Sequence, residues 1–243
     1  MGSDDNEDPE EFKKEALPRA AGVQRAVWDL RYEGTHKIKG GRIDTGDPIE
    51  GPRVAPGTYT VRLTGGGKMQ TATVKVLADP RGDLPQQDLE AQAAFAIRVR
   101  DDISRLTDLV NQIRSVRDQL KARNTALEWR KSDAGVTDLI KSSEAVIKKA
   151  DALEDKLHNP TAEVVYDILA MRGGTRLYSR LSPLQMWSVE AAGLPTAGMM
   201  QVLAGQEQEL TSLEAETRQF ASTDVAAINQ RASQLGLAYV ILK

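Results

Sequence analysis

The chain has 243 residues, a formal net charge of -3 at pH 7 and 28% charged residues, which are ordinary values for a folded globular protein. This nearly neutral balance offers no electrostatic reason to expect a nucleic-acid partner. The absence of cysteine excludes disulfides and cysteine nucleophiles, and only His36 and His158 are available for a metal centre or a catalytic triad. We therefore expect neither a metal nor another cofactor.

The chain begins with an acidic tract, Ser3 to Glu11, which has no cationic or apolar segment of the kind that forms a signal peptide. We predict that residues 1–16 are disordered, because a charged segment with so few apolar residues cannot bury a core. No later stretch is apolar for long enough to predict a membrane-spanning helix.

Glycine and proline cluster in the next part of the chain, and the segments between them alternate apolar and polar residues as half-buried strands do. Gln24 to Tyr32 and Gly57 to Leu63 show this pattern, and Gly65-Gly66-Gly67 supplies the turn that leads into a strand from Lys68 to Leu77. We predict a small, incomplete Ig-like antiparallel β module over residues 17–82. Since an Ig-like sandwich needs about seven strands, the helical part, an upstream segment or a partner chain would have to complete the sheet.

Apolar residues then change to helical spacing, which predicts a long antiparallel α-helical bundle over residues 83–243 and an overall α+β fold. Asp83 with Leu84-Pro85 marks the start of a helix with a heptad pattern from Leu89 to Leu120, and a second pattern runs from Val136 to Leu157. Pro195-Thr196 starts the last long helix. Because three such patterns occur in one chain, we favour an internal bundle over an intermolecular coiled coil.

Shorter features of the helical part carry predictions of their own. We expect Tyr166, Tyr178 and Trp187 to pack onto the antiparallel pair formed by the first two long helices. Ser222-Thr223-Asp224 offers a cap for a new helix from Val225 to Leu235, with Gly236 as the residue that follows its end. The apolar end, Leu237 to Leu242, is expected to lie against the bundle or to pair with a strand. Arginine and lysine residues at the end of the first long helix are interpreted as a solvated face: Arg114, Arg117, Lys121, Arg123, Arg130 and Lys131.

Several groups of residues have side chains that could bind a metal or a phosphate or could act in catalysis. Asp44, Asp47 and Glu50 could hold calcium, or could act with Asp29 as the acid and base of a glycosidase, but we favour a solvated acidic loop. Gly65 to Lys68 lacks the spacing of a phosphate-binding loop, so we interpret it as a turn. No nucleophile elbow, zinc-protease motif or dinucleotide fingerprint occurs in the sequence. These observations favour a protein that is not an enzyme.

Three aromatic residues, Trp28, Tyr32 and Tyr59, have two interpretations. They could stack on a sugar ring as a carbohydrate-binding platform. Their alternation in the predicted strands favours an inward, core-facing role instead.

The segments Gly22 to Tyr32 and Gly51 to Leu63, with Asp79-Pro80-Arg81, resemble the C-terminal region of bacterial sortilin-type β-propeller proteins with neuraminidase-like repeats, often labelled glycosyl hydrolases. The resemblance continues through Leu194-Pro195-Thr196 and residues 223–229, so it covers nearly all of the chain after about residue 17. In that family the propeller would hold any hydrolytic site, and this chain contains no propeller blade.

The resemblance implies an accessory region outside the cytoplasm, although the sequence shows no signal peptide. Our leading hypothesis is a non-catalytic interaction or scaffolding module that docks onto a β-propeller or another subunit. The alternative is a carbohydrate-binding module whose partner is a polysaccharide.

Overall fold

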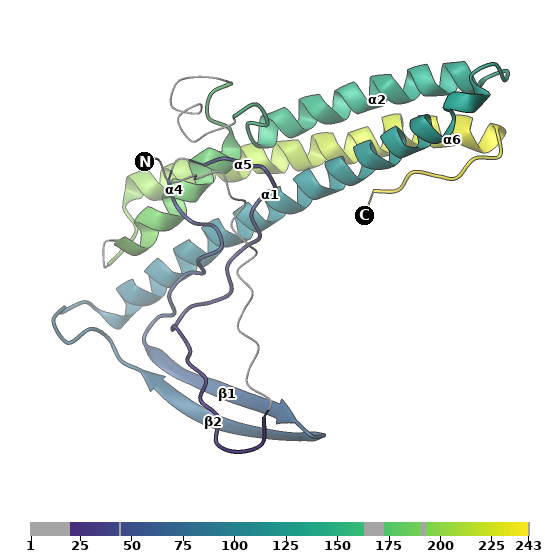
Figure 1. Cartoon of the computed structure of the whole chain (residues 1–243). Helices are drawn as coiled ribbons and strands as arrows, with labels where there is room; N and C mark the ends of the chain where they lie inside the picture. The colour runs from purple at the N-terminus through teal and green to yellow at the C-terminus, as the bar shows by residue number, and fades with distance from the viewer. Residues whose placement is uncertain (1–19, 44, 163–172, 191–192, 243) are drawn as a thin grey trace, which may run out of the picture.

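The computed structural model describes residues 20–43, 45–162, 173–190 and 193–242. Within these ranges the chain is an α+β structure in which a two-stranded β-hairpin precedes four helical segments that pack together (Figure 1). The predicted acidic N-terminus lies outside the described residues, and so does Tyr166. No helix of the described part is long and apolar enough to cross a membrane.

The hairpin consists of β1 (Gly57–Gly65) and β2 (Lys68–Val76), which pair antiparallel with Gly65 opposite Lys68. Gly66 and Gly67 form the two-residue loop and have φ angles of 55° and 73°. Positive φ at both loop positions matches the right-handed twist of paired strands and favours glycine. The predicted hairpin and its glycine turn are confirmed.

The predicted strand from Gln24 to Tyr32 is not formed. This segment makes a single bridge between Arg31 and Arg53, and Leu30 has a φ of 60°, which breaks the pleat that a strand requires. The sheet of the described residues therefore has two strands, and the Ig-like sheet predicted for residues 17–82 is not present in them.

The bundle is built around α1 (Gln86–Ala126), which contains no glycine or proline and packs against α2 (Val136–Leu157), α4 (Leu177–Glu190) and α5 (Ala197–Phe220). α1 starts after Pro85, which occupies the N-cap position expected for Asp83. A short 3-10 turn, η1 (Glu128–Arg130), leads into α2. Fully buried residues of α1 recur at helical spacing: Val99, Ile103, Leu106, Val110, Ile113 and Leu120. The predicted internal bundle follows from this continuous apolar stripe.

Outcomes differ for the aromatic residues of α4. Tyr178 is buried at 1% exposure, as predicted, whereas Trp187 is 52% exposed, so its predicted packing is wrong. The difference arises because Tyr178 lies on the side of α4 that also buries Leu181, Gln185 and Ser188, whereas Trp187 lies on the opposite side of the helix.

The last helical segment runs on without the predicted break. α5 starts at the predicted place, where the Thr196 side chain accepts a hydrogen bond from the Met199 amide at 3.2 Å. It continues through one π-helical turn, η2 (Ala221–Val225), into α6 (Ala226–Gln234). The Thr223 hydroxyl donates back to the carbonyl of Gln219 at 2.7 Å, so it does not cap a new helix.

Residues that precede the hairpin belong to the core of the bundle. Ile38 is 2% exposed within the same apolar cluster as α1. The Thr107 hydroxyl donates to the carbonyl of His36 at 3.3 Å, and Arg114 Nη1 donates to the carbonyl of Lys39 at 2.7 Å. The chain therefore crosses the bundle before it leaves to form the hairpin, which projects from the end where α1 begins (Figure 1).

Candidate interaction surface on the projecting hairpin

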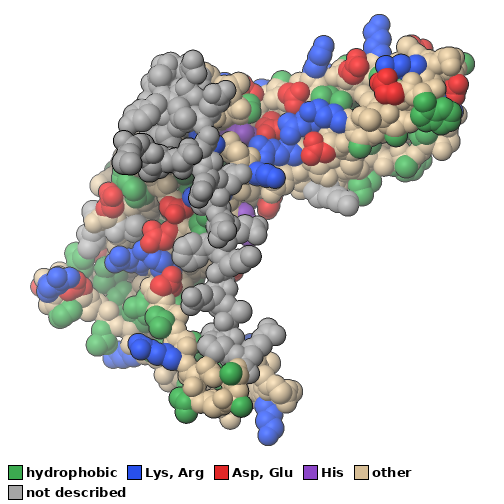
Figure 2. Space-filling view, viewed as in Figure 1, with side chains coloured by type: hydrophobic (Ala, Val, Ile, Leu, Met, Phe, Trp, Pro, Cys, Tyr) green, Lys and Arg blue, Asp and Glu red, His purple; other side chains and the backbone are tan. Residues whose placement is uncertain are grey.

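The hairpin has an apolar face that, among the described residues, is largely exposed beyond Tyr59. The strand register places Tyr59 opposite Val74 and Val61 opposite Ala72, and Leu63 follows on the same face. Val61 is 51% exposed and Leu63 is 60% exposed. We call this surface, made of Tyr59, Val61, Leu63, Ala72 and Val74, the hairpin face. Hydrophobic side chains are visible on this projecting part of the molecule in Figure 2.

The opposite side of the hairpin is polar. It consists of residues that alternate with the hairpin face: Thr58, Thr60, Arg62, Thr64, Met69, Thr71, Thr73 and Lys75. Alternation of this kind is typical of a sheet with one face in water and one face packed on apolar groups. An isolated two-stranded hairpin is at best marginally stable in water. The hairpin face therefore exposes apolar side chains in a pattern that is typical of a packed sheet face.

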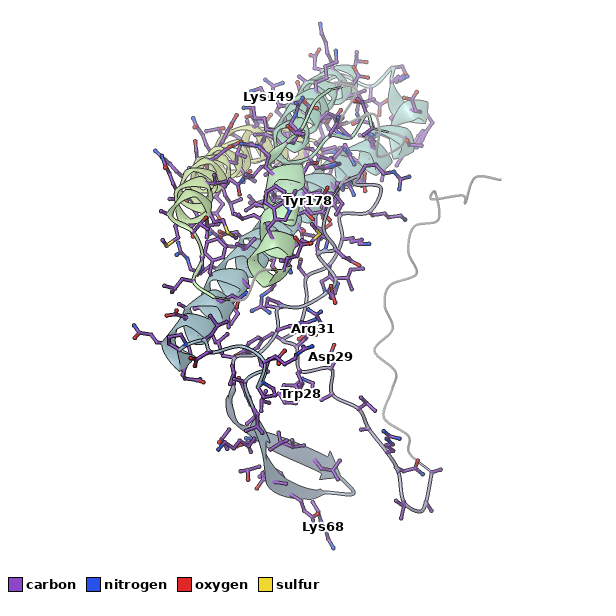
Figure 3. All side chains as sticks on the ribbon, turned by 90° about the vertical axis from the view of Figure 1, so that its left-hand side faces the viewer. Trp28, Asp29, Arg31, Lys68, Lys149 and Tyr178 are labelled. Carbon is purple, nitrogen blue, oxygen red and sulfur yellow. The ribbon has the colours of Figure 1, made fainter. Side chains whose placement is uncertain are left out.

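The hairpin is also strongly basic. Between Gly57 and Val76 the chain contains Arg62, Lys68 and Lys75 but no aspartate or glutamate. Lys68 lies at the tip, far from the bundle (Figure 3). A surface of one charge sign attracts partners of the opposite sign and disfavours pairing with a copy of itself.

The three aromatic residues predicted from the sequence come together at the base of the hairpin. The rings of Trp28 and Tyr59 meet edge to face, with centroids 5.4 Å apart and planes at 67°. The Tyr59 hydroxyl donates to the carbonyl of Ala55 at 2.6 Å. Burial, and then the charge of and a hydrogen bond with the nearby Tyr32, raise the pKa of Tyr59.

This aromatic group is partly open, in contrast to the predicted inward orientation. Trp28 is 39% exposed and Tyr32 is 38% exposed, because the strand that would have turned them into a core is not formed. Trp28 Nε1 donates to the carbonyl of Arg31 at 3.0 Å, which holds the indole ring against the hairpin. The aromatic group therefore extends the hairpin face toward the bundle.

Arg31 anchors the base of the hairpin (Figure 3). Its Nη1 donates to the carbonyl of Gly51 at 2.9 Å, and the guanidinium forms an ion pair with Glu50. From the bundle side, Gln86 Nε2 donates to the carbonyl of Pro56 at 2.6 Å. These contacts hold the start of β1 while the rest of the hairpin extends into solvent.

The carboxylates considered for calcium or glycosidase chemistry serve local structure. Asp47 Oδ1 accepts a hydrogen bond from the Ile49 amide at 3.1 Å and lies 3.4 Å from Lys37 Nζ. Asp29 Oδ1 accepts from the Arg31 amide at 3.0 Å. Asp44 lies outside the described residues. In the part of the chain that the structure describes, no three histidine, aspartate or glutamate side chains gather as metal ligands would.

A buried charged cluster joins α1 and α2, and sequence reasoning missed it. Glu154 is 2% exposed; its two carboxylate oxygens accept from Arg114 Nε at 2.7 Å and Arg117 Nη1 at 2.6 Å. His158 Nε2 lies 2.8 Å from Glu154 Oε1. The interpretation of Arg114 and Arg117 as a solvated face is therefore wrong. The available signal was Glu154, four residues before His158 and beside the apolar positions Leu153 and Leu157.

The arginines determine the charge state of Glu154. Burial by itself raises the pKa of this carboxyl, but hydrogen bonds from His158 and Arg114, with the charges of Arg114 and Arg117, lower it to about 2. The cluster stays ionised at neutral pH and links α1 to the end of α2. Since Arg114 also holds Lys39, the cluster supports the segment that leads to the hairpin.

Comparisons with protein-family models, with curated proteins and with solved structures gave no match for this chain. The functional argument therefore rests on the geometry and charge of the hairpin.

Proposed function

We propose that this chain is a non-catalytic interaction module that uses its hairpin face to dock onto the β-sheet of a partner protein. The observation that carries the proposal is the open apolar face of a two-stranded hairpin held on a well-packed bundle. Val61 and Leu63 remain more than half exposed, although their alternation with threonines is that of a buried sheet face. A partner sheet that packs on them would remove this apolar surface from water.

The hairpin edges provide a second mode of attachment. In the described residues, β1 and β2 pair only with each other, so each has one unpaired edge. Unpaired edges are templates for added strands. A partner that adds strands would extend the two-stranded sheet. The family resemblance would make that partner a β-propeller or another subunit outside the cytoplasm.

Charge indicates the chemistry of the partner surface. The three cations and absent carboxylates of Gly57–Val76 favour a partner whose apolar sheet is bordered by aspartate and glutamate. Lys68 lies on the side of the hairpin face and opposes face-to-face pairing of two copies of the chain, whereas Arg62 and Lys75 lie on the polar side. We therefore expect weaker docking as the ionic strength rises.

Because the chain has no cysteine, one introduced cysteine gives a unique position for a cross-linker. We would label Leu63→Cys on the hairpin face and Thr60→Cys on the polar side, and irradiate each in an extract of the source cells. The proposal expects one partner protein to be cross-linked from Leu63→Cys and little from Thr60→Cys. Equal labelling from both faces, or cross-links only between copies of the chain, would contradict it.

The partner obtained in this way is then titrated against purified variants. Val61→Asn should weaken binding by roughly tenfold, because about 1.4 kcal/mol of apolar contact is lost. Thr60→Asn is the matched control, since it introduces the same side chain on the polar side, and it should change the affinity by less than about twofold. An unchanged affinity for Val61→Asn would remove the hairpin face from the interface.

A second candidate function, carbohydrate binding, is favoured by one specific observation. Trp28, Tyr32 and Tyr59 lie together and are partly exposed, as ring-stacking residues must be. The test is tryptophan fluorescence during titration with cell-wall and plant polysaccharides. A spectral change that disappears in Trp28→Ala but persists in the control Trp187→Ala would support this function. No change with any polysaccharide would reject it.

A further inference from the structure

The C-terminal tail, residues 237–242, is held on the bundle by two side-chain amides. Asn229 of α6 binds both backbone groups of Val240: its Oδ1 accepts from the amide at 2.8 Å and its Nδ2 donates to the carbonyl at 2.7 Å. Gln119 of α1 does the same for Ile241, at 3.0 Å and 2.8 Å. Each side-chain amide thus forms hydrogen bonds with both the backbone N–H and the backbone C=O of one tail residue, as a neighbouring β-strand would.

This arrangement of hydrogen bonds binds a backbone in an extended conformation. Consecutive residues of an extended chain direct their backbone groups to opposite sides, and here Val240 faces Asn229 while Ile241 faces Gln119. The tail lies between side chains of α1 and α6, two helices that are far apart in the sequence. Gln119 and Ile241 are 122 residues apart. We call the surface formed by Gln119, Asn229 and the adjoining residues of α6 the tail groove.

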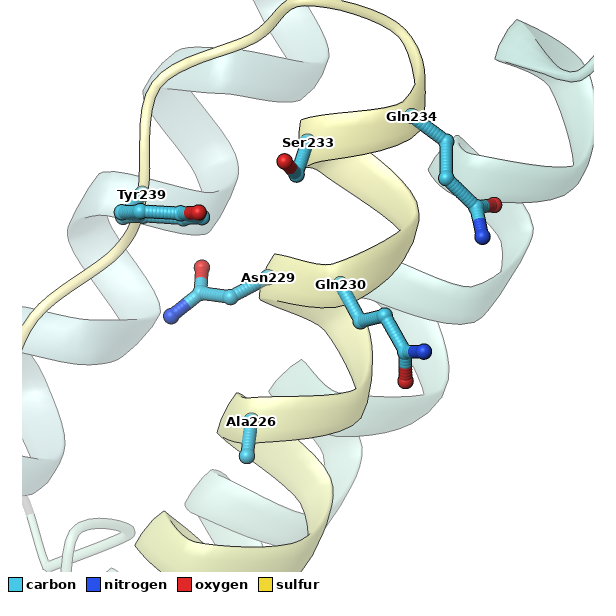
Figure 4. A pocket seen from close by; sticks show the side chains of 6 residues that line it. All are labelled: Ala226, Asn229, Gln230, Ser233, Gln234 and Tyr239. Atoms are coloured by element: carbon cyan, nitrogen blue, oxygen red, sulfur yellow. The ribbon is translucent and has the colours of Figure 1, made fainter.

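Val240 has the most buried side chain of the described tail, and Leu237 and Leu242 are partly buried against the same core cluster. Val240 is 3% exposed, whereas Tyr239 is 64% and Ile241 is 50% exposed. Beside Tyr239 an open hollow of about 520 Å³ is lined by Ala226, Asn229, Gln230, Ser233, Gln234 and Tyr239 (Figure 4). The tail groove therefore buries a small branched apolar side chain at the Val240 position and contacts apolar side chains at the Leu237 and Leu242 positions. It leaves space for a large side chain one residue before Val240.

The turn that brings the tail to the groove is a defined hinge. The Gly236 amide donates to the carbonyl of Ser233 at 3.0 Å and the Leu237 amide donates to the carbonyl of Ala232 at 2.9 Å. This is the Schellman pattern, and Gly236 adopts the left-handed φ of 67° that it needs. Rotation at this one glycine would release the tail with the loss of the Leu237–Ala232 hydrogen bond, while the hydrogen bonds within α6 stay in place.

We propose that the tail groove is a binding site for an extended, uncharged peptide segment with a β-branched residue at its centre, and that the chain's own tail occupies it. The ligand in another protein would have the same chemistry as residues 237–242. The groove contacts mainly the backbone through four hydrogen bonds, so it accepts varied sequences around the buried position. The tail competes with such a ligand from within the same molecule, as an autoinhibitory segment does.

The test uses the full chain and a fluorescent peptide with the sequence of residues 236–242 as the probe. Val240→Asp places a charge at the buried position and should release the tail while leaving the groove residues unchanged. Fluorescence anisotropy should show that this variant binds the probe about tenfold or more tightly than the wild-type chain. The reason is that a tethered segment competes at an effective concentration on the order of millimolar.

Two controls separate the groove from non-specific apolar binding. Adding Asn229→Ala and Gln119→Ala to Val240→Asp should weaken probe binding by about thirtyfold or more, because four hydrogen bonds are lost. A probe with aspartate at its valine position should not bind. Equal binding by wild type, Val240→Asp and the triple variant would overturn the proposal, as would no binding by a folded Val240→Asp chain. Circular dichroism checks folding, and if Val240→Asp does not fold, the milder Val240→Ala takes its place with the same expected order.

Discussion

At Glu154 a single carboxylate is enclosed by two guanidinium groups and an imidazole, and it joins α1 to α2. Arg114 and Arg117 are themselves about four-fifths buried, with side-chain exposures of 21% and 19%. Such a cluster adds little stability relative to apolar packing, but it is sensitive to the loss of one member. The two arginines would then retain their charges in a poorly solvated site.

We therefore predict that Glu154→Gln lowers the free energy of unfolding by about 3 kcal/mol, the usual cost of breaking a buried ion pair. Urea denaturation followed by circular dichroism at pH 7 measures it. Glu216→Gln is the matched control, because Glu216 pairs with Lys156 while both side chains are nearly half exposed. That substitution should cost less than about 1 kcal/mol. Equal losses for the two variants would contradict the role of the cluster.

The same carboxyl predicts how stability depends on pH. Its pKa is lowered from 4.5 to about 2 in the folded chain, so the unfolded chain binds the proton more readily. The contribution of Glu154 is complete above about pH 5 and is lost as the pH falls toward 2. The difference in unfolding free energy between wild type and Glu154→Gln should shrink by about 2 kcal/mol from pH 7 to pH 3. A constant difference over this range would show that the carboxyl titrates normally.

At the scale of elements, the hairpin depends on its two-residue turn. Gly67 has a φ of 73°, and an alanine in this left-handed region costs about 1 kcal/mol or more. We predict that Gly67→Ala speeds amide hydrogen exchange in β1 and β2 by about fivefold and leaves α1 and α2 unchanged. Faster exchange throughout the bundle would mean that the hairpin and the helices unfold together.

A glycine within α5 should respond in the opposite direction. Gly205 lies inside this helix without a positive φ, and a Cβ placed on it would meet no atom within 4 Å. Gly205→Ala should therefore raise the unfolding free energy by about 0.5–1 kcal/mol, because alanine loses less conformational entropy in a helix. A lower melting temperature for this variant would contradict the exposed position of Gly205.

At the scale of the whole molecule, the segment before the hairpin and the helices after it share one core. We predict that Ile38→Ala destabilises the helical bundle by about 2–5 kcal/mol, although Ile38 precedes the hairpin, because a fully buried side chain is lost. Val27→Ala, at an 81% exposed position, should cost almost nothing. The midpoint of urea unfolding, followed by the helical signal, checks both. Equal midpoints for wild type and Ile38→Ala would place Ile38 outside the core.

The two proposed binding surfaces lie at different places in the molecule. The apolar hairpin face and the tail groove lie on different parts of the chain, one at the start of α1 and one beside α6. The two surfaces that we propose for binding are therefore separate in the fold. Binding at each surface can be tested separately, because variants at Val61 change the hairpin face and variants at Val240 change the tail groove.

The sequence by itself determined the local elements. The alternation from Gly57 to Val76 with its glycine turn, the three-four spacing of α1 and α2, and the cap at Thr196 depend on neighbours within a few residues, so each was predictable. The tertiary structure alone decided which aromatic residues are exposed, that Ile38 enters the bundle core, and that Glu154 gathers Arg114 and Arg117. The tail groove also depends on the tertiary structure, because Gln119 and Ile241 come together only when α1 and α6 pack side by side with the tail between them. Contacts between residues far apart in the chain leave no periodic pattern, and that is why these features required the folded structure.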